Sequence, residues 1–281
     1  MVKKQILVAG LGIVLVIVLF IFGGTVVPKK QSANQPEKTE VFDIQSNINK
    51  SKVKLTPSQT IFLSQLENGI TRGDVKDQQI KAYESLASFW EDSVHNHNAY
   101  IYYISKAAKL ENSEKKLNFA ARLYLEDLKR EHDPARLAWK TDEAILLFEK
   151  ALVLNPDDDD LKIGLGSSYI YGKGPSGDPQ QTMAGIQQLL SVVRKDSNNM
   201  KAQFVLAVGG AVSGQYEKAI ERFKKVIAAE PNNVEAVAFL ADTYAADGQK
   251  EEAIKWYNIS KKLVNNPAYS KEVDAHIQSL K

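Results

Sequence analysis

Two consecutive segments decide the fold of this chain: residues 200–233, MKAQFVLAVGGAVSGQYEKAIERFKKVIAAEPNN, and residues 234–267, VEAVAFLADTYAADGQKEEAIKWYNISKKLVNNP. Aligned at an offset of 34 residues, they share small, turn and aromatic residues in a fixed order. Matching pairs include Leu206 with Leu240, Gly214 with Gly248, Ala219 with Ala253, and Phe223 with Tyr257. Self-similarity at one fixed period is the signature of a repeat architecture.

Each copy of the repeat predicts a helix hairpin. In the second helix, Ala219, Phe223 and Val226 recur at i, i+4 and i+7, which places them on one face of an α-helix. Gly214 lies where the chain must reverse between the two helices, and Pro231 begins the link to the next hairpin. The small alanine lets the helices approach closely, and the aromatic side chain fills the space beside it.

This pattern resembles the tetratricopeptide repeat, whose signature combines Leu-Gly/Ala, Tyr, Ala, an aromatic residue and Pro over 34 residues. The resemblance extends upstream, and we predict five repeats, at residues 80–112, 114–156, 159–198, 200–233 and 234–266. The last two are the most regular. The resemblance implies an all-α fold, a right-handed superhelical stack of helix hairpins that binds other proteins.

The second and third repeats contain insertions. Eleven extra residues in the second repeat predict a lengthened helix, with Asp133 as its N-cap and Pro134 at its first position. Seven extra residues in the third repeat correspond to a loop around Gly172–Pro179.

Three segments flank the repeats. Residues 55–79 predict a leading helical segment, with a helix over 56–72 that Thr56 caps. Residues 267–281 predict a capping helix, because Tyr269, Val273, Ile277 and Leu280 form a single apolar stripe. Residues 29–54 are rich in Lys, Gln, Ser and Asn, which predicts a flexible linker.

The N-terminal region predicts a membrane anchor. After a short tail at residues 1–4, the segment 5–28 carries no charge. As a helix, its apolar run Ile6–Val27 would span about 33 Å, close to the ~30 Å hydrocarbon core of a bilayer. A cleaved signal peptide is the alternative. Its apolar region is shorter, about 7–15 residues, and Thr25-Val26-Val27-Pro28 is a poor cleavage site.

The orientation of the anchor follows from its flanking charges, which are nearly balanced: Lys3 and Lys4 precede it, and Lys29 and Lys30 follow it. A very short basic N-terminus favours the cytoplasmic side. We therefore expect a single-pass protein of the bacterial inner membrane with its body in the periplasm; a cytoplasmic body is the alternative. This architecture resembles bacterial periplasmic repeat scaffolds, including those that present apocytochrome during cytochrome c maturation.

Composition excludes several classes of function. The chain has 36 basic and 34 acidic residues, and without the four N-terminal lysines the body has 32 against 34, a net charge of −2. It therefore shows no basic footprint for nucleic acid. The absence of cysteine excludes disulfides, thiolate metal sites and a cysteine nucleophile. No motif for catalysis, a cofactor or a metal is complete, and no pattern indicates an oligomeric state.

A membrane-bound enzyme is the second functional hypothesis. Its site would lie in the segment 55–113, where Asp92, His95 and His97 are close in sequence. A polar turn between two helices is the competing interpretation of these three residues.

The favoured hypothesis is a protein-interaction scaffold. In the family, the second, fifth, ninth, twelfth and thirteenth positions of a repeat face a concave groove. The resemblance assigns to this groove Ile163, Ile170, Tyr171, Lys201, Phe204, Val208, Val212 and Asp242. Family members that grip a C-terminal carboxylate carry Lys and Asn where this chain has Phe204 and Val208, so that clamp is absent. A largely apolar groove predicts a helical or apolar partner segment. Packing against neighbouring helices is the alternative role of these residues.

Overall fold

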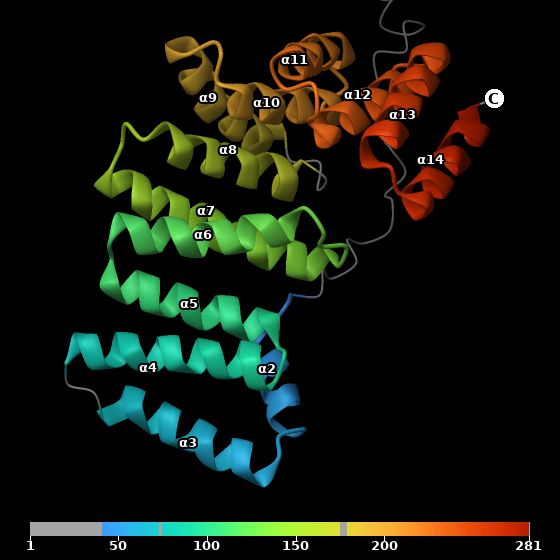
Figure 1. Cartoon of the computed structure of the whole chain (residues 1–281). Helices are drawn as coiled ribbons and strands as arrows, with labels where there is room; N and C mark the ends of the chain where they lie inside the picture. Colours follow the sequence, from blue (N-terminus) through green and yellow to red (C-terminus); the bar gives the residue numbers. More distant parts are fainter. Residues whose placement is uncertain (1–40, 73–74, 175–178, 281) are drawn as a thin grey trace, which may run out of the picture. The chain divides into compact units, whose positions relative to one another are not determined.

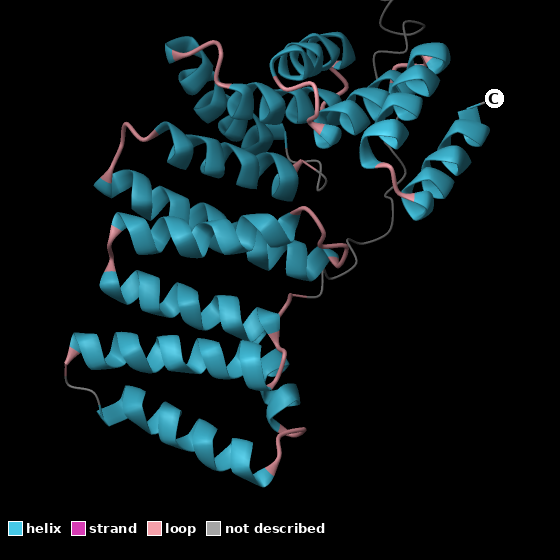
Figure 2. Ribbon diagram, viewed as in Figure 1, coloured by secondary structure: helices cyan, strands magenta, loops and turns pink. Residues whose placement is uncertain are grey.

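The computed structural model describes residues 41–72, 75–174 and 179–280 of the chain. The described residues form helices joined by short turns, without any strand (Figure 2). None of these helices has the length and apolar character needed to cross a membrane. The predicted tail, anchor and first part of the linker lie outside the described residues.

The first group of helices contains α2 (Ile44–Lys52), α3 (Pro57–Arg72), α4 (Lys76–Ser88), the π-helical turn η1 (Phe89–Ser93) and α5 (His97–Glu111). Helix α3 begins as predicted, because the N–H of Gln59 donates to the hydroxyl of Thr56 at 3.3 Å. Helices α4 and α5 pack as a hairpin, and α3 packs on α4 (Figure 1).

Helix α2 corrects the expectation of a flexible linker over residues 29–54 for its described part, residues 41–54. Asp43 caps it by accepting a hydrogen bond from the N–H of Gln45, and Ile48 is fully buried. The side-chain amide of Asn96, at the start of α5, donates to Asn47 and Ser51. The polar composition of this segment conceals a short helix held by one buried apolar residue and by side-chain hydrogen bonds.

The remaining helices are α6 (Glu114–Leu128), α7 (Pro134–Leu154), α8 (Asp159–Lys173), α9 (Pro179–Lys195), α10 (Met200–Val212), α11 (Tyr216–Ala229), α12 (Val234–Ala246), α13 (Lys250–Val264) and α14 (Pro267–Leu280). Consecutive helices from α6 to α13 pack as hairpins, and neighbouring hairpins pack on one another (Figure 1). Helix α14 covers α13 and buries Val273 and Ile277.

The turns and caps of the last two hairpins repeat at the predicted spacing. Gly214 and Gly248 adopt φ values of +74° and +78°, a conformation that suits glycine because it lacks a Cβ. Asn199 and Asn233 cap α10 and α12, each accepting a hydrogen bond from a backbone N–H three residues later. The sequence match therefore reflects equivalent local geometry.

The core of the repeats is formed by paired alanines and aromatic residues. Phe148 and Phe223 are fully buried, as are Ala144 and Ala219 four residues before them. The insertion in the second repeat lengthens α7 to 21 residues, with Asp133 accepting from the N–H of Arg136 at 2.8 Å. This confirms the predicted cap and start of that helix.

Candidate protein-binding groove

A groove of about 990 Å³ lies between the α6–α7 turn, the C-terminal part of α8, and helices α10 and α12. Its floor and walls include the apolar side chains of Leu128, Leu137, Ile170, Tyr171, Val208, Val212 and Phe239. Its charged lining residues are Glu126, Lys129, Arg130, Glu131, Lys173 and Glu235. We call this site the α8–α10 groove.

Half of the residues assigned to a groove from the sequence meet here. Ile170 and Val208 are buried at the floor, Tyr171 is half-buried, and Val212 is 49% exposed at the end of α10. These four come from two consecutive repeats. Their convergence gives the site an apolar surface that remains open to solvent at Val212.

The other four predicted residues lie elsewhere. Ile163 is buried in the core, and Lys201 pairs with Asp160 on the surface at 3.3 Å. Asp242 faces α13 within its own hairpin, where the hydroxyl of Tyr257 donates to it at 2.5 Å. These residues occupy repeat positions that face the groove in the family, but they do not line the α8–α10 groove of this chain.

Phe204 is the most instructive of the four. Its ring lies edge-on to those of Phe223 and Phe239, with centroids 5.8 Å and 5.7 Å away. The large side chain fills the space between the second helix of its own hairpin and the first helix of the next. Phe204 thus packs against neighbouring helices and does not line the α8–α10 groove.

Sequence reasoning missed the wall that the α6–α7 turn contributes. Leu128, Lys129 and Arg130 end or follow α6, and Leu137 lies in the first part of α7. The eleven-residue insertion before Ala144 was the available signal, because it breaks the regular repeat at this point.

Tyr171 is the most unusual group of the groove. Its hydroxyl is buried and has no hydrogen-bond partner among the described residues. Burial, and then the negative charges of Glu235 and Glu126, raise the pKa of the phenol, so Tyr171 is protonated at neutral pH. Lys129 places its ammonium group 5.9 Å from the centroid of the tyrosine ring. The hydroxyl is enclosed by the protein in this structure and is not open to a partner in the groove.

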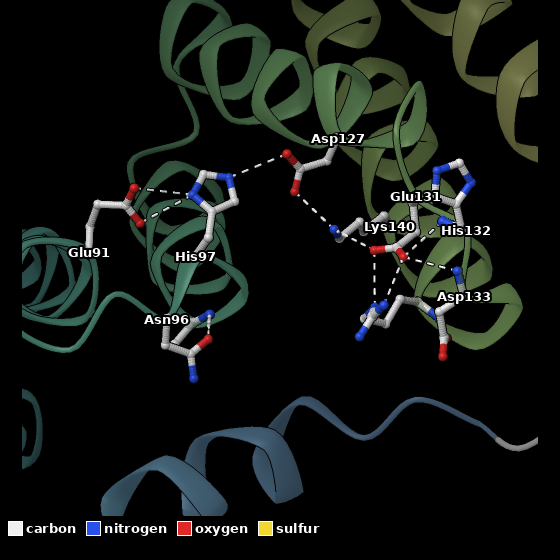
Figure 3. A network of polar contacts seen from close by, with 10 residues as sticks. Glu91, Asn96, His97, Asp127, Glu131, His132, Asp133 and Lys140 are labelled. Atoms are coloured by element: carbon white, nitrogen blue, oxygen red, sulfur yellow. Dashed lines mark hydrogen bonds and ion pairs between the residues drawn. The ribbon is translucent and has the colours of Figure 1, made fainter. Parts of the chain in front are cut away.

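A buried polar network holds the α6–α7 turn (Figure 3). Lys140, whose side chain is 7% exposed, lies 3.0 Å from Asp127 and 2.9 Å from Glu131. Glu131 also accepts hydrogen bonds from the Arg136 guanidinium at 3.1 Å and from the backbone N–H groups of His132 and Asp133. The network therefore ties the turn to the first two turns of α7.

His97 extends this network to α5. Its Nε2 lies 3.4 Å from Asp127, and its Nδ1 lies 3.1 Å from Glu91 (Figure 3). The hydrogen bond with Asp127 raises the pKa of His97 above 6.5, although partial burial opposes this shift. Burial also opposes ionisation of Glu131, but Arg136 and Lys140 outweigh it and lower the pKa of this carboxyl to about 2. Arg136 and Lys140 thus pair with Glu131, and Lys140 also pairs with Asp127.

The residues of the enzyme hypothesis are not assembled into one site. Both ring nitrogens of His97 contact carboxylates, and His95 contacts the backbone carbonyl of Glu91 at 3.0 Å. His95 and His97 line one depression, whereas Asp92 lines another beside Phe62. No cluster of three or more potential metal ligands occurs in residues 41–72, 75–174 and 179–280.

Comparisons with known proteins agree with the repeat geometry. Residues 213–271 match the tetratricopeptide repeat family. TTC0263, a thermophilic TPR protein of Thermus thermophilus, is 15% identical with a TM-score of 0.51, covering 72% of this chain and 98% of its own. At this identity the likeness shows the fold alone, a tetratricopeptide-type stack of helix hairpins.

Two further solved structures are similar to this chain. MamA from Desulfovibrio magneticus RS-1 is 18% identical with a TM-score of 0.47, covering 69% of this chain and 97% of its own. YrrB, described as a TPR protein with an unusual peptide-binding site, is 18% identical with a TM-score of 0.44. The alignment covers 72% of this chain and 98% of the YrrB chain. The search of curated proteins finds no match to this chain.

Proposed function

We propose that this protein is a protein-interaction scaffold that binds a helical or apolar segment of a partner protein in the α8–α10 groove. The observation that carries the proposal is the largely apolar groove that Tyr171, Val208 and Val212 line, which is open to solvent at Val212. Apolar grooves with a few well-placed polar groups are typical of binding sites.

The charged groups around the groove favour binding over catalysis. Glu131 is held by Lys140 and Arg136, and Lys173 lies 2.6 Å from Asp142. A general acid or base has to exchange a proton with a substrate, but these groups are already paired. The polar network instead stabilises the wall of the groove.

Photo-crosslinking in cells tests the proposal. A photoreactive residue is placed at Val212 in the groove, and a control at Val153, which is 80% exposed on α7 and does not line the groove. We expect a covalent adduct with a partner protein from position 212 only. Equal adducts from both positions, or none from position 212, would contradict groove binding.

We also propose that residues 5–28 anchor the scaffold in a bacterial inner membrane with the body in the periplasm. There it would serve envelope protein assembly or cytochrome c maturation. The uncharged apolar run Ile6–Val27 supports the anchor. The full chain should remain in membranes after carbonate washing; release of a chain shortened by about 25 residues would show a cleaved signal instead.

Protease accessibility tests the orientation. In cells with a permeabilised outer membrane, added protease should digest the repeats if they lie in the periplasm. Protection of the repeats would place them in the cytoplasm.

A further inference from the structure

We propose that the partner segment bound in the α8–α10 groove is an α-helix whose groove-facing side chains are apolar and uncharged. The inference rests on the proposed function and deepens it, because it chooses a helix over an extended segment and fixes the charge of the buried face. Two properties of the groove carry it: the hydrogen-bonding state of the floor and the balance of the charges around the floor.

The floor of the groove consists of apolar side chains on helical backbone. Val208 and Phe239 line it from the middle of α10 and α12, where the backbone N–H and C=O groups bond within the helix. The hydroxyl of Tyr171 is enclosed by the protein and does not face a partner. The described residues also contain no strand whose edge could pair with another chain. This floor therefore offers no row of free backbone groups to an extended segment.

The same floor favours a helix as the partner. An extended segment has free N–H and C=O groups, and burying them against apolar side chains leaves them without partners at a cost in free energy. An α-helix bonds these groups internally and presents only side chains. A helix that lies along the groove can contact Val208, Val212 and Phe239 with residues at i, i+3, i+4 and i+7. It does so without burying an unpaired backbone group.

The charges that line the groove are balanced. The acidic residues are Glu126, Glu131 and Glu235, and the basic residues are Lys129, Arg130 and Lys173. Four of the six already have ion-pair partners, and Arg130 and Glu235, one of each sign, are exposed to solvent. Because neither sign dominates, the groove gives no electrostatic preference for a charged partner.

A charge on the buried face of the partner would be unfavourable. Ile170 and Val208 are buried at the floor, and a lysine or glutamate placed against them would lose water without gaining an ion pair. On the sides of the partner helix, charged residues of either sign would remain in solvent. The partner is therefore an amphipathic helix with an apolar, uncharged stripe.

Selection from a random peptide library tests the inference. Displayed peptides of about 16 residues, or four to five helical turns, are selected against the full chain in lipid nanodiscs. Prior depletion on empty nanodiscs removes peptides that bind lipid. We expect the selected peptides to carry apolar residues at i, i+3 or i+4, and i+7, with no proline between them. Apolar residues at every second position, or prolines in the centre, would overturn the helix.

Substitutions in a selected peptide test the two properties separately, with affinity measured by fluorescence anisotropy. A central proline should weaken binding at least about tenfold, or about 1.4 kcal/mol, whereas alanine at the same polar position should not. Lysine and glutamate on the apolar stripe should each weaken binding by a similar factor. The affinity of the parent peptide should change less than about threefold between low and high salt. Tighter binding of the lysine or the glutamate peptide would overturn the uncharged face.

Groove variants separate this inference from the proposed function. Val212→Asp should weaken the selected peptides at least about tenfold, whereas Val153→Asp, outside the groove on α7, should not. Extended or charged peptides that lose affinity for Val212→Asp would overturn the neutral helix but leave groove binding in place. Failure to select any peptide, or equal affinity for Val212→Asp and the wild type, would overturn groove binding itself. Unchanged circular dichroism shows that each variant is folded.

Discussion

Replacing Lys140 with methionine removes the buried cation that stabilises the α6–α7 wall of the groove. The side chain of Lys140 is 7% exposed and that of Glu131 is 8% exposed, and their charged groups lie 2.9 Å apart. The same ammonium group lies 3.0 Å from Asp127. Methionine keeps most of the volume of the side chain but leaves two partly buried carboxylates with fewer partners.

The size of the effect follows from the pKa of Glu131. Its fall from 4.5 to about 2 corresponds to roughly 3 kcal/mol of stabilisation at neutral pH, since each unit of pKa is worth about 1.36 kcal/mol. Removing one partner of a buried pair costs about 3–5 kcal/mol. Because Arg136 still holds Glu131 and His97 still contacts Asp127, we expect Lys140→Met to cost about 3 kcal/mol.

Urea unfolding of the full chain, followed by circular dichroism at neutral pH, measures this cost. Lys201→Met is the control, because the pair of Lys201 with Asp160 is solvent-exposed and should contribute less than about 1 kcal/mol. The deficit of Lys140→Met should shrink as the pH falls below about 4.5, because Glu131 then gains a proton in the variant. A cost below about 1 kcal/mol, or one independent of pH, would refute the reasoning.

Three further predictions concern stability. The pKa of His97 is raised above 6.5, so the contribution of His97 to the stability of the fold is complete below pH 6.5 and is lost as the pH rises through the raised pKa. His97→Asn should remove this pH dependence from unfolding curves measured at a series of pH values. Phe223→Ala should cost about 3–5 kcal/mol in urea unfolding, and Phe204→Asp should also destabilise the fold, since the rings are in contact. Unchanged stability of Phe204→Asp would place Phe204 on an open surface. Gly214→Ala should destabilise the fold by about 1–2 kcal/mol and so lower the thermal midpoint, because φ at this position is +74°. Gly69→Ala in α3 is the control and should not lower the midpoint.

The repeats were predictable because their signals are local. A cap such as Asn199, a turn glycine such as Gly214, and a buried alanine four residues before an aromatic each act within one hairpin. The same local chemistry fixed Asp133 and Pro134 at the start of α7. Periodicity therefore sufficed to locate these hairpins.

Helix α2 and the π-helical turn η1 were not predictable in this way. Helix α2 has one buried residue, Ile48, and its stability depends on contacts with α5, which is distant in sequence. The backbone N–H of Asn96 donates to the carbonyl of Trp90, six residues earlier, and closes the turn after η1. The sequence signals of α2 are short, the N-cap Asp43 and the pair Ile44 and Ile48 at i and i+4, and η1 leaves no periodic trace.

The groove was only half predictable, because family positions report the direction of a side chain but not what fills the space in front of it. At Val212 that space is open, whereas at Phe204 it is occupied by Phe223 and Phe239. The wall from the α6–α7 turn comes from an insertion, for which the repeat pattern assigns no position. Side-chain volume and an irregular segment therefore decided the shape of the site.

The affinity of the chain for the protein that crosslinks at position 212 tests the central claim most directly. It is compared for the wild type, Val212→Asp in the groove and Val153→Asp outside it, both of which add one charge to an exposed valine. Groove binding predicts that Val212→Asp weakens the complex at least about tenfold, or about 1.4 kcal/mol, while Val153→Asp leaves it unchanged. Equal affinities for all three proteins would contradict it.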